Sequence, residues 1–483
     1  MSLIDRFLLQ CTAGPDRTAL IQDERLLTYS EVDRGARGIA AVLEERSIRP
    51  GDRIAIALER GIDAALSIYA TLYLGASYVP LEIKNPAPRL QGIVKDALPR
   101  AIIGAGGRPD WVTGDVDWLD VDQLADHRSS LAPRAVAAEA PAAILYTSGS
   151  GGTPKGIALS HRAMTAFADW AGAAFSVGTE DRIASLAPFY FDLSVFDLYA
   201  SMRHGAALDF VPDALTLAPS RLSAWLDDRK ITCWYTVPSI LAFLAFKGSL
   251  ADRVFDKLTR ILFAGDVFPT PQLIKLARFL PTVNLFNLYG PTETNVCCYW
   301  PVNRARLDPG QPIPIGVPAC GARLRIDEAN GELLVKGPSL MSGYWKQGGL
   351  ERVFDGNGWY RTGDRVSRNE AGEFLYYGRL DRMLKCSGYR VEPAEIEAVV
   401  CRFPGVEQCA VVGIADSAGG RRPAAAIVFD GEPDLFGLAR SLRSQLPSYM
   451  QPARLVPCDH LPYLPNGKVD YQTLEKRLRS EPL

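Results

Sequence analysis

Apolar runs typical of buried β-strands alternate with helical stretches through the N-terminal part of the chain. The strand-like runs cover residues 53–57, 143–146 and 259–264, and the helical stretches cover residues 29–45 and 271–279. Thr270 stands directly before Pro271, which predicts a helix N-cap with the proline at the first helical position. This alternation favours an α/β fold with layered subdomains and parallel strands.

The pattern changes twice towards the C-terminus. Residues 312–377 contain frequent glycines and short strand-like segments such as 332–335, which predicts a β-rich subdomain. After Gly378 the chain has helical or strand-like segments at residues 394–402, 408–414, 424–429 and 435–446. We therefore expect a large N-terminal domain over residues 1–380 and a small α+β C-terminal domain over residues 381–483.

Composition narrows the possible roles. A length of 483 residues allows more than one hydrophobic core, and a formal net charge of −2 gives no electrostatic reason to expect nucleic acid. Residues 64–81 carry no charge, but polar residues, a glycine and a proline interrupt them, so we expect a helix to Leu74 and a short strand rather than a membrane span. Nine scattered cysteines without a CxxC pair, and an acidic N-terminus unlike a signal peptide, predict free thiols in a reducing cytoplasm.

The segment 146–156 carries the strongest chemical signal. It follows an apolar strand and holds four Ser or Thr residues, four glycines and Lys155 within eleven positions. Glycines let backbone N–H groups approach an oxyanion, hydroxyls add donors, and a lysine offsets phosphate charge. The Gly-Lys-Ser/Thr ending of the Walker loop is missing, and a flexible linker would not need hydroxyls beside a lysine. The predicted phosphate-binding residues are Thr147, Ser148, Gly149, Ser150, Gly151, Gly152, Thr153 and Lys155.

At this loop the sequence resembles the adenylate-forming superfamily, which includes nonribosomal peptide adenylation domains, acyl-CoA synthetases and luciferases. The resemblance covers nearly the whole chain in the same order, beginning with two structural motifs at residues 27–31 and 75–81. It implies that the loop holds the triphosphate of ATP and the leaving pyrophosphate, with Lys155 as a catalytic residue. The fold it implies has a small C-terminal domain that moves relative to the large one.

Further motifs of the family lie in the second half of the chain. In the segment 287–293, Glu293 matches a catalytic ligand for Mg²⁺, a role that suits a hard carboxylate oxygen. Gly265-Asp266 stands where the family usually has Gly-Glu near the adenine, which leaves the role of the shorter carboxylate open. Asp364 suits the ribose hydroxyls because it can accept two hydrogen bonds. The full set that the resemblance assigns to ATP also contains Gly265, Asp266, Asn287, Tyr289, Gly290, Thr292, Asp364, Tyr376 and Arg379.

Three assignments concern the C-terminal domain. Asp381 matches the family hinge, and residues 385–392 resemble the segment that faces the active site in the second half-reaction. Lys468 matches the catalytic lysine that bridges the substrate carboxylate and the α-phosphate region. A lysine there is chemically reasonable, because two anions must meet in a closed site.

Residues 191–197 indicate which acid is activated. Asp192 matches the aspartate that pairs with the α-ammonium group of an amino acid, although an aspartate here is also suited to a helix N-cap. One pocket position is open between Tyr235 and Ser239. The other pocket positions, all apolar, are Leu193, Phe196, Leu262, Ala264, Leu288, Val296 and Cys297, so charged side chains are disfavoured.

With Tyr235 the pocket resembles that of freestanding ligases that load proline, so the best expectation is activation of a small apolar amino acid, L-proline, with ATP and Mg²⁺. The chain ends at Leu483 without a serine attachment motif, so we expect a separate phosphopantetheinylated carrier protein as partner. Two alternatives are an acyl-CoA synthetase acting on a non-amino acid and a catalytically inactive binding module of the same fold.

Overall fold

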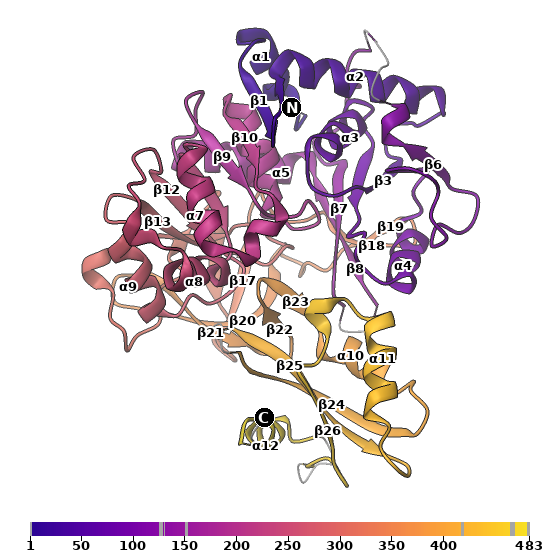
Figure 1. Cartoon of the computed structure of the whole chain (residues 1–483), viewed down its shortest axis with the longest axis vertical. Coiled ribbons are helices and arrows are strands. Elements are labelled where there is room, and N and C mark those ends of the chain that lie inside the picture. Colours follow the sequence, from indigo (N-terminus) through magenta and orange to yellow (C-terminus); the bar gives the residue numbers. More distant parts are fainter. Residues whose placement is uncertain are drawn as a thin grey trace.

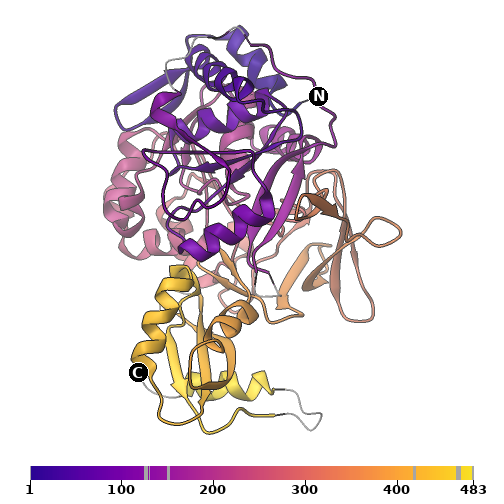
Figure 2. The ribbon, with the colours of Figure 1, turned by 90° about the vertical axis from the view of Figure 1, so that its right-hand side faces the viewer.

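The computed structural model describes residues 2–124, 129, 131–149, 153–416, 420–463 and 469–480. The protein is a mixed α/β molecule with a large N-terminal part and a smaller C-terminal unit below it in Figures 1 and 2. The α/β class and the division into large and small parts were predicted correctly. The domain boundary at residue 381 stays a prediction.

One sheet of the large part brings the phosphate-loop strands together. Its order within the described residues is β19-β18-β8-β7-β4-β3-β5-β6. The strands from β7 to β6 pair in parallel, whereas β7, β8, β18 and β19 pair antiparallel. Its strands are β3 (Arg53–Ala57), β4 (Ser77–Pro80), β5 (Ala101–Gly104), β6 (Asp117–Asp120), β7 (Pro141–Thr147), β8 (Lys155–Ser160), β18 (Gly343–Lys346) and β19 (Gly349–Glu351).

A second sheet has the order β15-β14-β13-β12-β11-β9-β10-β1-β2 among the described residues. Its central strands from β1 to β13 run parallel, as the alternation of strands and helices predicts. Its strands are β1 (Thr18–Gln22), β2 (Arg25–Thr28), β9 (Arg182–Ser185), β10 (Ala207–Phe210), β11 (Cys233–Thr236), β12 (Arg260–Phe263), β13 (Asn284–Tyr289), β14 (Cys298–Pro301) and β15 (Val317–Pro318).

Helices cover these sheets, and a large apolar core joins residues of both. The helices of this part are α1 (Asp5–Ala13), α2 (Tyr29–Glu45), α3 (Ile62–Tyr73), α4 (Ala87–Ala97), α5 (His161–Ala174), α6 (Met202–His204), α7 (Pro219–Asp228), α8 (Pro238–Lys247) and α9 (Thr270–Phe279). A π-helical turn, η2 (Phe196–Ser201), precedes α6. The helix and strand predicted within residues 64–81 correspond to α3 and β4.

Helix α2 begins and ends where the sequence predicts. Thr28 and Glu31 form a capping box, in which each side chain bonds the backbone N–H of the other. The prediction at α9 was wrong in one detail, because Thr270 is the first helical residue and Pro269 is the N-cap. The Thr270 hydroxyl instead donates to the carbonyl of Gln311 at 2.6 Å. A distant partner therefore outcompetes the local cap.

The β-rich region contains β16 (Arg323–Ile326), β17 (Glu332–Lys336), β20 (Tyr360–Arg368) and β21 (Phe374–Arg379), which pair antiparallel. The hairpin β22 (Leu384–Cys386) and β23 (Tyr389–Val391) leads into the C-terminal unit. That unit contains β24 (Val406–Ala415), β25 (Arg421–Phe429), β26 (Arg454–Pro457), α10 (Pro393–Val400), α11 (Leu435–Gln445) and α12 (Tyr471–Ser480), with an apolar core of its own. These elements agree with the predicted α+β pattern.

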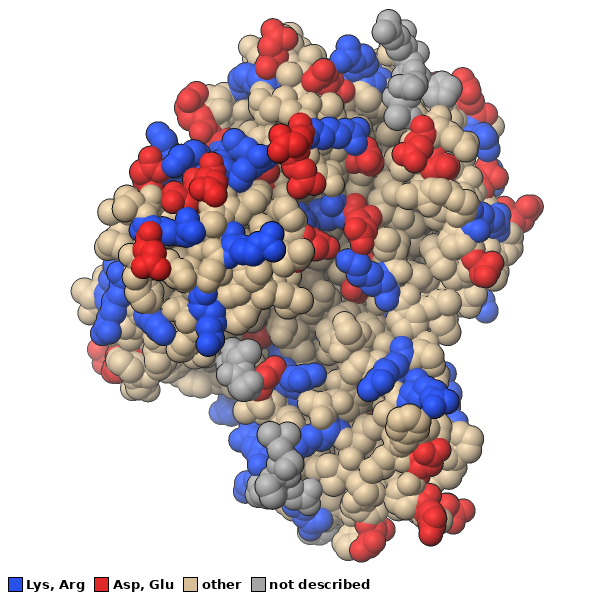
Figure 3. Space-filling model, in the orientation of Figure 1, with Lys and Arg blue, Asp and Glu red and all other residues tan. Residues whose placement is uncertain are grey.

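All nine cysteines are free, and five of them are buried. Within the described residues, no helix is both long and apolar enough to cross a membrane. The surface is hollowed where the C-terminal unit meets the large part, and lysines and arginines lie along the edges of this hollow (Figure 3).

Candidate functional site

The two strands that flank the glycine-rich loop fix the position of Lys155. Thr147 at the end of β7 pairs with Lys155 at the start of β8, so both ends of the loop are held in one sheet. The Lys155 ammonium lies 3.1 Å from a carboxylate oxygen of Glu293 and donates to the Tyr344 hydroxyl at 2.9 Å. Predicted residues Ser150, Gly151 and Gly152 lie outside the described residues.

Glu293 is fully buried among cationic and hydroxyl groups. Arg390 lies 2.9 and 3.1 Å from its two carboxylate oxygens, and the Tyr344 hydroxyl donates to it at 3.0 Å. Burial alone would raise the pKa of Glu293, but Arg390 and Lys155 outweigh it and hold that pKa well below its usual range. Glu293 is therefore an anion at every physiological pH, and Arg390 and Lys155 are the cations that pair with it in this structure.

This environment is compatible with Mg²⁺. Mg²⁺ is commonly held by one or two carboxylates together with substrate phosphates rather than by an all-protein cage. Among the described residues no cluster of three or more His, Cys, Asp or Glu side chains could hold a metal, whereas Glu293 supplies one carboxylate beside the phosphate loop. The buried hydroxyl of Thr147 also has no hydrogen-bond partner within the described residues, as expected for a donor reserved for a ligand.

The predicted nucleotide residues gather around Asp364. This buried carboxylate accepts a hydrogen bond from the Tyr289 hydroxyl and forms an ion pair with Arg379 at 3.1 Å. The ring of Tyr376 lies 6.0 Å from that of Tyr289, measured between centroids. A Cβ atom on Gly290 would lie 1.6 Å from the carbonyl oxygen of Asn295, so this turn requires glycine.

Three other predicted residues have different surroundings. Asp266 lies beside Gly388 of the C-terminal hairpin, and burial raises its pKa. Gly265 has φ of +95°, which favours glycine. The Asn287 amide donates to the carbonyl of Pro314 at 2.7 Å, so this side chain anchors the backbone segment that precedes β15.

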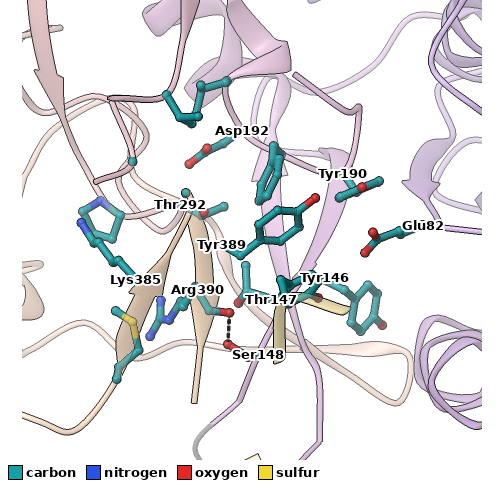
Figure 4. A pocket seen from close by; sticks show the side chains of 18 of the residues that line it. Glu82, Tyr146, Thr147, Ser148, Tyr190, Asp192, Thr292, Lys385, Tyr389 and Arg390 are labelled. Atoms are coloured by element: carbon teal, nitrogen blue, oxygen red, sulfur yellow. Dashed lines mark hydrogen bonds between the residues drawn. The ribbon is translucent and has the colours of Figure 1, made fainter. Parts of the chain in front are cut away.

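Asp192 and Thr292 lie close together in the lining of a cavity between the two parts of the molecule (Figure 4). Burial raises the pKa of Asp192 to about 6, although a hydrogen bond from Thr292 opposes this shift. Asp192 is partly buried and has no cationic partner among the described residues, which is an unfavourable arrangement for a charged carboxylate. An ammonium group of a ligand would supply that partner.

The predicted apolar pocket residues belong to a single cluster of buried side chains. They come from five separate segments, and they are Leu193, Phe196, Tyr235, Leu262, Ala264, Leu288, Val296 and Cys297. Ser239, the alternative to Tyr235, lies on α8 and lines a cavity together with Leu193 and Phe243. Tyr235 packs against Phe196 within this cluster, whereas Ser239 shares a cavity with Leu193, so the choice between Tyr235 and Ser239 stays a prediction.

Residues of the C-terminal hairpin cover the site from below (Figure 4). The Lys385 ammonium lies 5.7 and 5.3 Å from the ring centroids of Tyr289 and Tyr376. Tyr389 meets Phe191 at 4.7 Å between centroids, and its ring stacks on Tyr449 at 3.9 Å. The segment 385–392 thus faces the site in this orientation.

Two residues of this site were not assigned from the sequence. Tyr344 joins Lys155 to Glu293, but nothing in its local sequence distinguishes it from other tyrosines. Arg390 lay within the segment expected to face the site, and its pairing with Glu293 had no local signal.

Lys468 lies outside the described residues. Asp381, the predicted hinge, is exposed and accepts a hydrogen bond from Arg379 at 2.8 Å.

A family model described as AMP-binding enzyme matches residues 7–345. A second one, described as the C-terminal domain of AMP-binding enzymes, matches residues 395–468. The chain belongs to the AMP-binding enzyme family. It is an adenylate-forming enzyme and ATP is its nucleotide, as the resemblance predicted.

Two relatives carry the same name, L-proline–[L-prolyl-carrier protein] ligase. The protein from Streptomyces coelicolor is 38% identical over 93% of this chain and 91% of its own length. The protein from Pseudomonas fluorescens is 33% identical over 99% of both chains. A solved o-succinylbenzoate CoA synthetase from Bacillus subtilis superposes with a TM-score of 0.87 over 98% of each chain, and its 22% identity shows the shared fold alone.

Proposed function

We propose that this AMP-binding enzyme activates L-proline as prolyl-AMP and transfers the prolyl group to the phosphopantetheine thiol of a separate carrier protein. The single observation that carries the proposal is the position of Asp192, a partly buried carboxyl with no cationic partner among the described residues, beside the apolar cluster and the nucleotide residues. The names of the two relatives support the same substrate and the same kind of partner.

The first half-reaction joins two anions. A carboxylate oxygen of proline attacks the α-phosphorus of ATP, the bond to the β-phosphate oxygen breaks, and pyrophosphate leaves. The nucleophile is already ionised at neutral pH, so no general base is needed, and catalysis consists of positioning and charge neutralisation. We assign Lys155, which lies at the phosphate loop beside Glu293, to charge neutralisation on the phosphates. We assign Lys468 to the α-phosphate and the substrate carboxylate.

The remaining side chains position the two substrates. Asp192 pairs with the ammonium of proline, and the apolar cluster that contains Phe196 and Tyr235 surrounds its ring. Asp364 accepts hydrogen bonds from the ribose, and Tyr289 packs against the base. Glu293, together with the nucleotide phosphates, would hold Mg²⁺, which supplies charge neutralisation for the triphosphate.

In the second half-reaction the thiol sulfur attacks the acyl carbon, AMP leaves, and the thiol proton is lost. The hairpin residues 385–391 lie at the site in the present orientation, so we assign this orientation to the transfer step. Movement of the C-terminal unit between the steps would carry the hairpin away from the site for adenylate formation, the step to which we assign Lys468. The nine free thiols support a reducing compartment for the enzyme.

A pyrophosphate-exchange assay across all amino acids tests the first step. We expect proline to give the highest exchange, and a different amino acid exceeding it by about tenfold would exclude the substrate assignment. Loading of a phosphopantetheinylated carrier protein, compared with free CoA, tests the second step. Formation of a CoA ester instead of a loaded carrier would favour an acyl-CoA synthetase, and absence of exchange with every acid would favour an inactive binding protein.

A further inference from the structure

Three side chains form a path from the cavity beside Asp192 to the surface of the large part. Tyr389 lies on β23 of the C-terminal hairpin, Tyr190 lies between β9 and η2, and Glu82 follows β4. All three line the cavity that also contains Asp192, and Figure 4 shows them next to one another. Glu82 and Tyr190 also line a second cavity, together with the exposed Lys84, so this end of the path lies near solvent.

The Tyr190 hydroxyl connects the other two groups. It hydrogen-bonds with Glu82, which favours the charged carboxylate, and with the Tyr389 hydroxyl. The rings are packed in place, because Phe191 lies 5.4 Å from Tyr190 and 4.7 Å from Tyr389 between centroids. The Tyr389 ring also stacks on Tyr449 at 3.9 Å. Since Tyr389 belongs to the C-terminal hairpin, the path is complete only while the hairpin is at the site.

Burial gives the three groups different protonation states. It raises the pKa of Tyr190 and of Tyr389, so both hydroxyls stay protonated at neutral pH and can pass a proton on only while they receive another. It also raises the pKa of Glu82, which makes this carboxylate a stronger base than an exposed one. The charged and titratable side chains that act on Glu82 or respond to it are Tyr190, Tyr389, Tyr449, Arg89 and Lys84.

The transfer step releases a proton that such a path can remove. The attacking group is a thiol, and a cysteine thiol has a pKa of about 8.5, so most of it is protonated at neutral pH. The thiolate is the nucleophile, which means that the S–H proton must leave before or during the attack. A base within reach of that proton accelerates the step.

We propose that Glu82 accepts the thiol proton of the transfer step through the hydroxyls of Tyr389 and Tyr190. The sulfur–carbon bond forms, the bond from the acyl carbon to the phosphate oxygen of AMP breaks, and AMP carries away the electron pair of that bond. The thiol proton passes to the Tyr389 oxygen, Tyr389 gives its own proton to Tyr190, and Tyr190 gives its proton to Glu82. Glu82 then releases the proton to solvent through the second cavity. The inference rests on the proposed function, because it assumes that transfer occurs in the present orientation.

Single-turnover transfer from preformed prolyl-AMP to two small thiols tests the path. Pantetheine is a weakly acidic thiol, whereas trifluoroethanethiol is more acidic and more of it is already thiolate. At pH 7, Glu82→Gln should slow transfer to pantetheine by about a hundredfold, the lower end of base catalysis, and transfer to trifluoroethanethiol by much less. The loss with pantetheine should shrink as the pH rises towards 9, because the free thiolate then replaces the missing base.

Two further variants break the path at its other members. Tyr190→Phe and Tyr389→Phe keep the rings and remove the hydroxyls, so they should show the same dependence on thiol acidity, and they decide the question if Glu82→Gln does not fold. Pyrophosphate exchange transfers no proton and should stay close to the wild-type rate in all three variants. Glu59→Gln is the matched control, because Glu59 is an exposed carboxyl near Glu82, and it should behave as the wild type in both assays.

Two results would overturn the inference. A merely structural role for these residues predicts equal slowing with both thiols at every pH. Proton transfer to water or to the phosphate of AMP predicts no slowing in any variant. The proposed function fails separately, when the wild-type protein shows no proline-dependent pyrophosphate exchange.

Discussion

The ring of Phe196 meets that of Tyr235 edge to face, with ring centroids 5.6 Å apart. Phe196 begins the π-helical turn η2, and Tyr235 lies on β11, so two separate segments build this side of the apolar cluster. Aromatic pairs of this geometry are stiff and well packed. The proposed proline site, with such a pair on one side, suits a compact apolar side chain.

This pair leads to a prediction about substrate size. Tyr235→Phe should keep proline as the preferred substrate, whereas Tyr235→Ala should lower kcat/KM for proline by about a hundredfold and favour larger apolar amino acids. Pyrophosphate exchange over an amino-acid panel measures both effects. Ser239→Ala is the control and should leave the preference unchanged. A loss of proline preference in Ser239→Ala, with Tyr235→Ala unaffected, would reverse the assignment of this position.

Asp192 predicts how activity depends on pH. Its raised pKa, about 6 in the free protein, means that the carboxyl becomes protonated as the pH falls through 6 and then cannot pair with an ammonium group. The kcat/KM for proline should therefore fall about tenfold per pH unit below 6, whereas KM for ATP should change little. The control variant, Asp192→Asn, should have a low kcat/KM for proline at every pH, and its profile should lack the fall below pH 6. A wild-type profile that stays flat down to pH 5 would refute the role of Asp192.

The role assigned to Asp364 predicts that nucleotide binding depends on the ribose hydroxyls. We expect Asp364→Asn to raise KM for ATP by about tenfold to a hundredfold, because a charged acceptor held by Tyr289 and Arg379 is lost. The wild-type enzyme should discriminate against dideoxy-ATP, and the variant should discriminate much less. Equal discrimination by both proteins would show that Asp364 does not bind the ribose.

The role assigned to Lys468 predicts that removing this lysine slows the two half-reactions to different extents. Lys468→Ala should reduce adenylate formation far more than transfer from preformed prolyl-AMP, because the lysine neutralises charge only in the first step. Pyrophosphate exchange and single-turnover carrier loading measure the two steps separately. The neighbouring exposed Lys476, changed to alanine, is the control and should affect neither. Equal losses in both steps for Lys468→Ala would remove the assigned role.

Much of the local structure followed from neighbouring residues. The bounds of α2 were predicted because Thr28 and Glu31 cap the helix from within its own first turn. The cap at Thr270 was predicted wrongly, because its hydroxyl bonds Gln311, a residue that no local pattern connects with it. Local signals succeed where the bonding partner is near in sequence and fail where a distant partner competes.

The sequence by itself determined the family, the α/β class and the kinds of chemical groups available, since glycines, hydroxyls, a lysine and carboxylates at fixed spacings already specify nucleotide chemistry. Only the tertiary structure decided that Lys155, Tyr344 and Arg390 meet at Glu293 and that Phe196 and Tyr235 pack against each other. The reason is physical: such meetings depend on how whole sheets and the C-terminal unit pack against one another, and contacts between remote segments have no counterpart in local sequence periodicity.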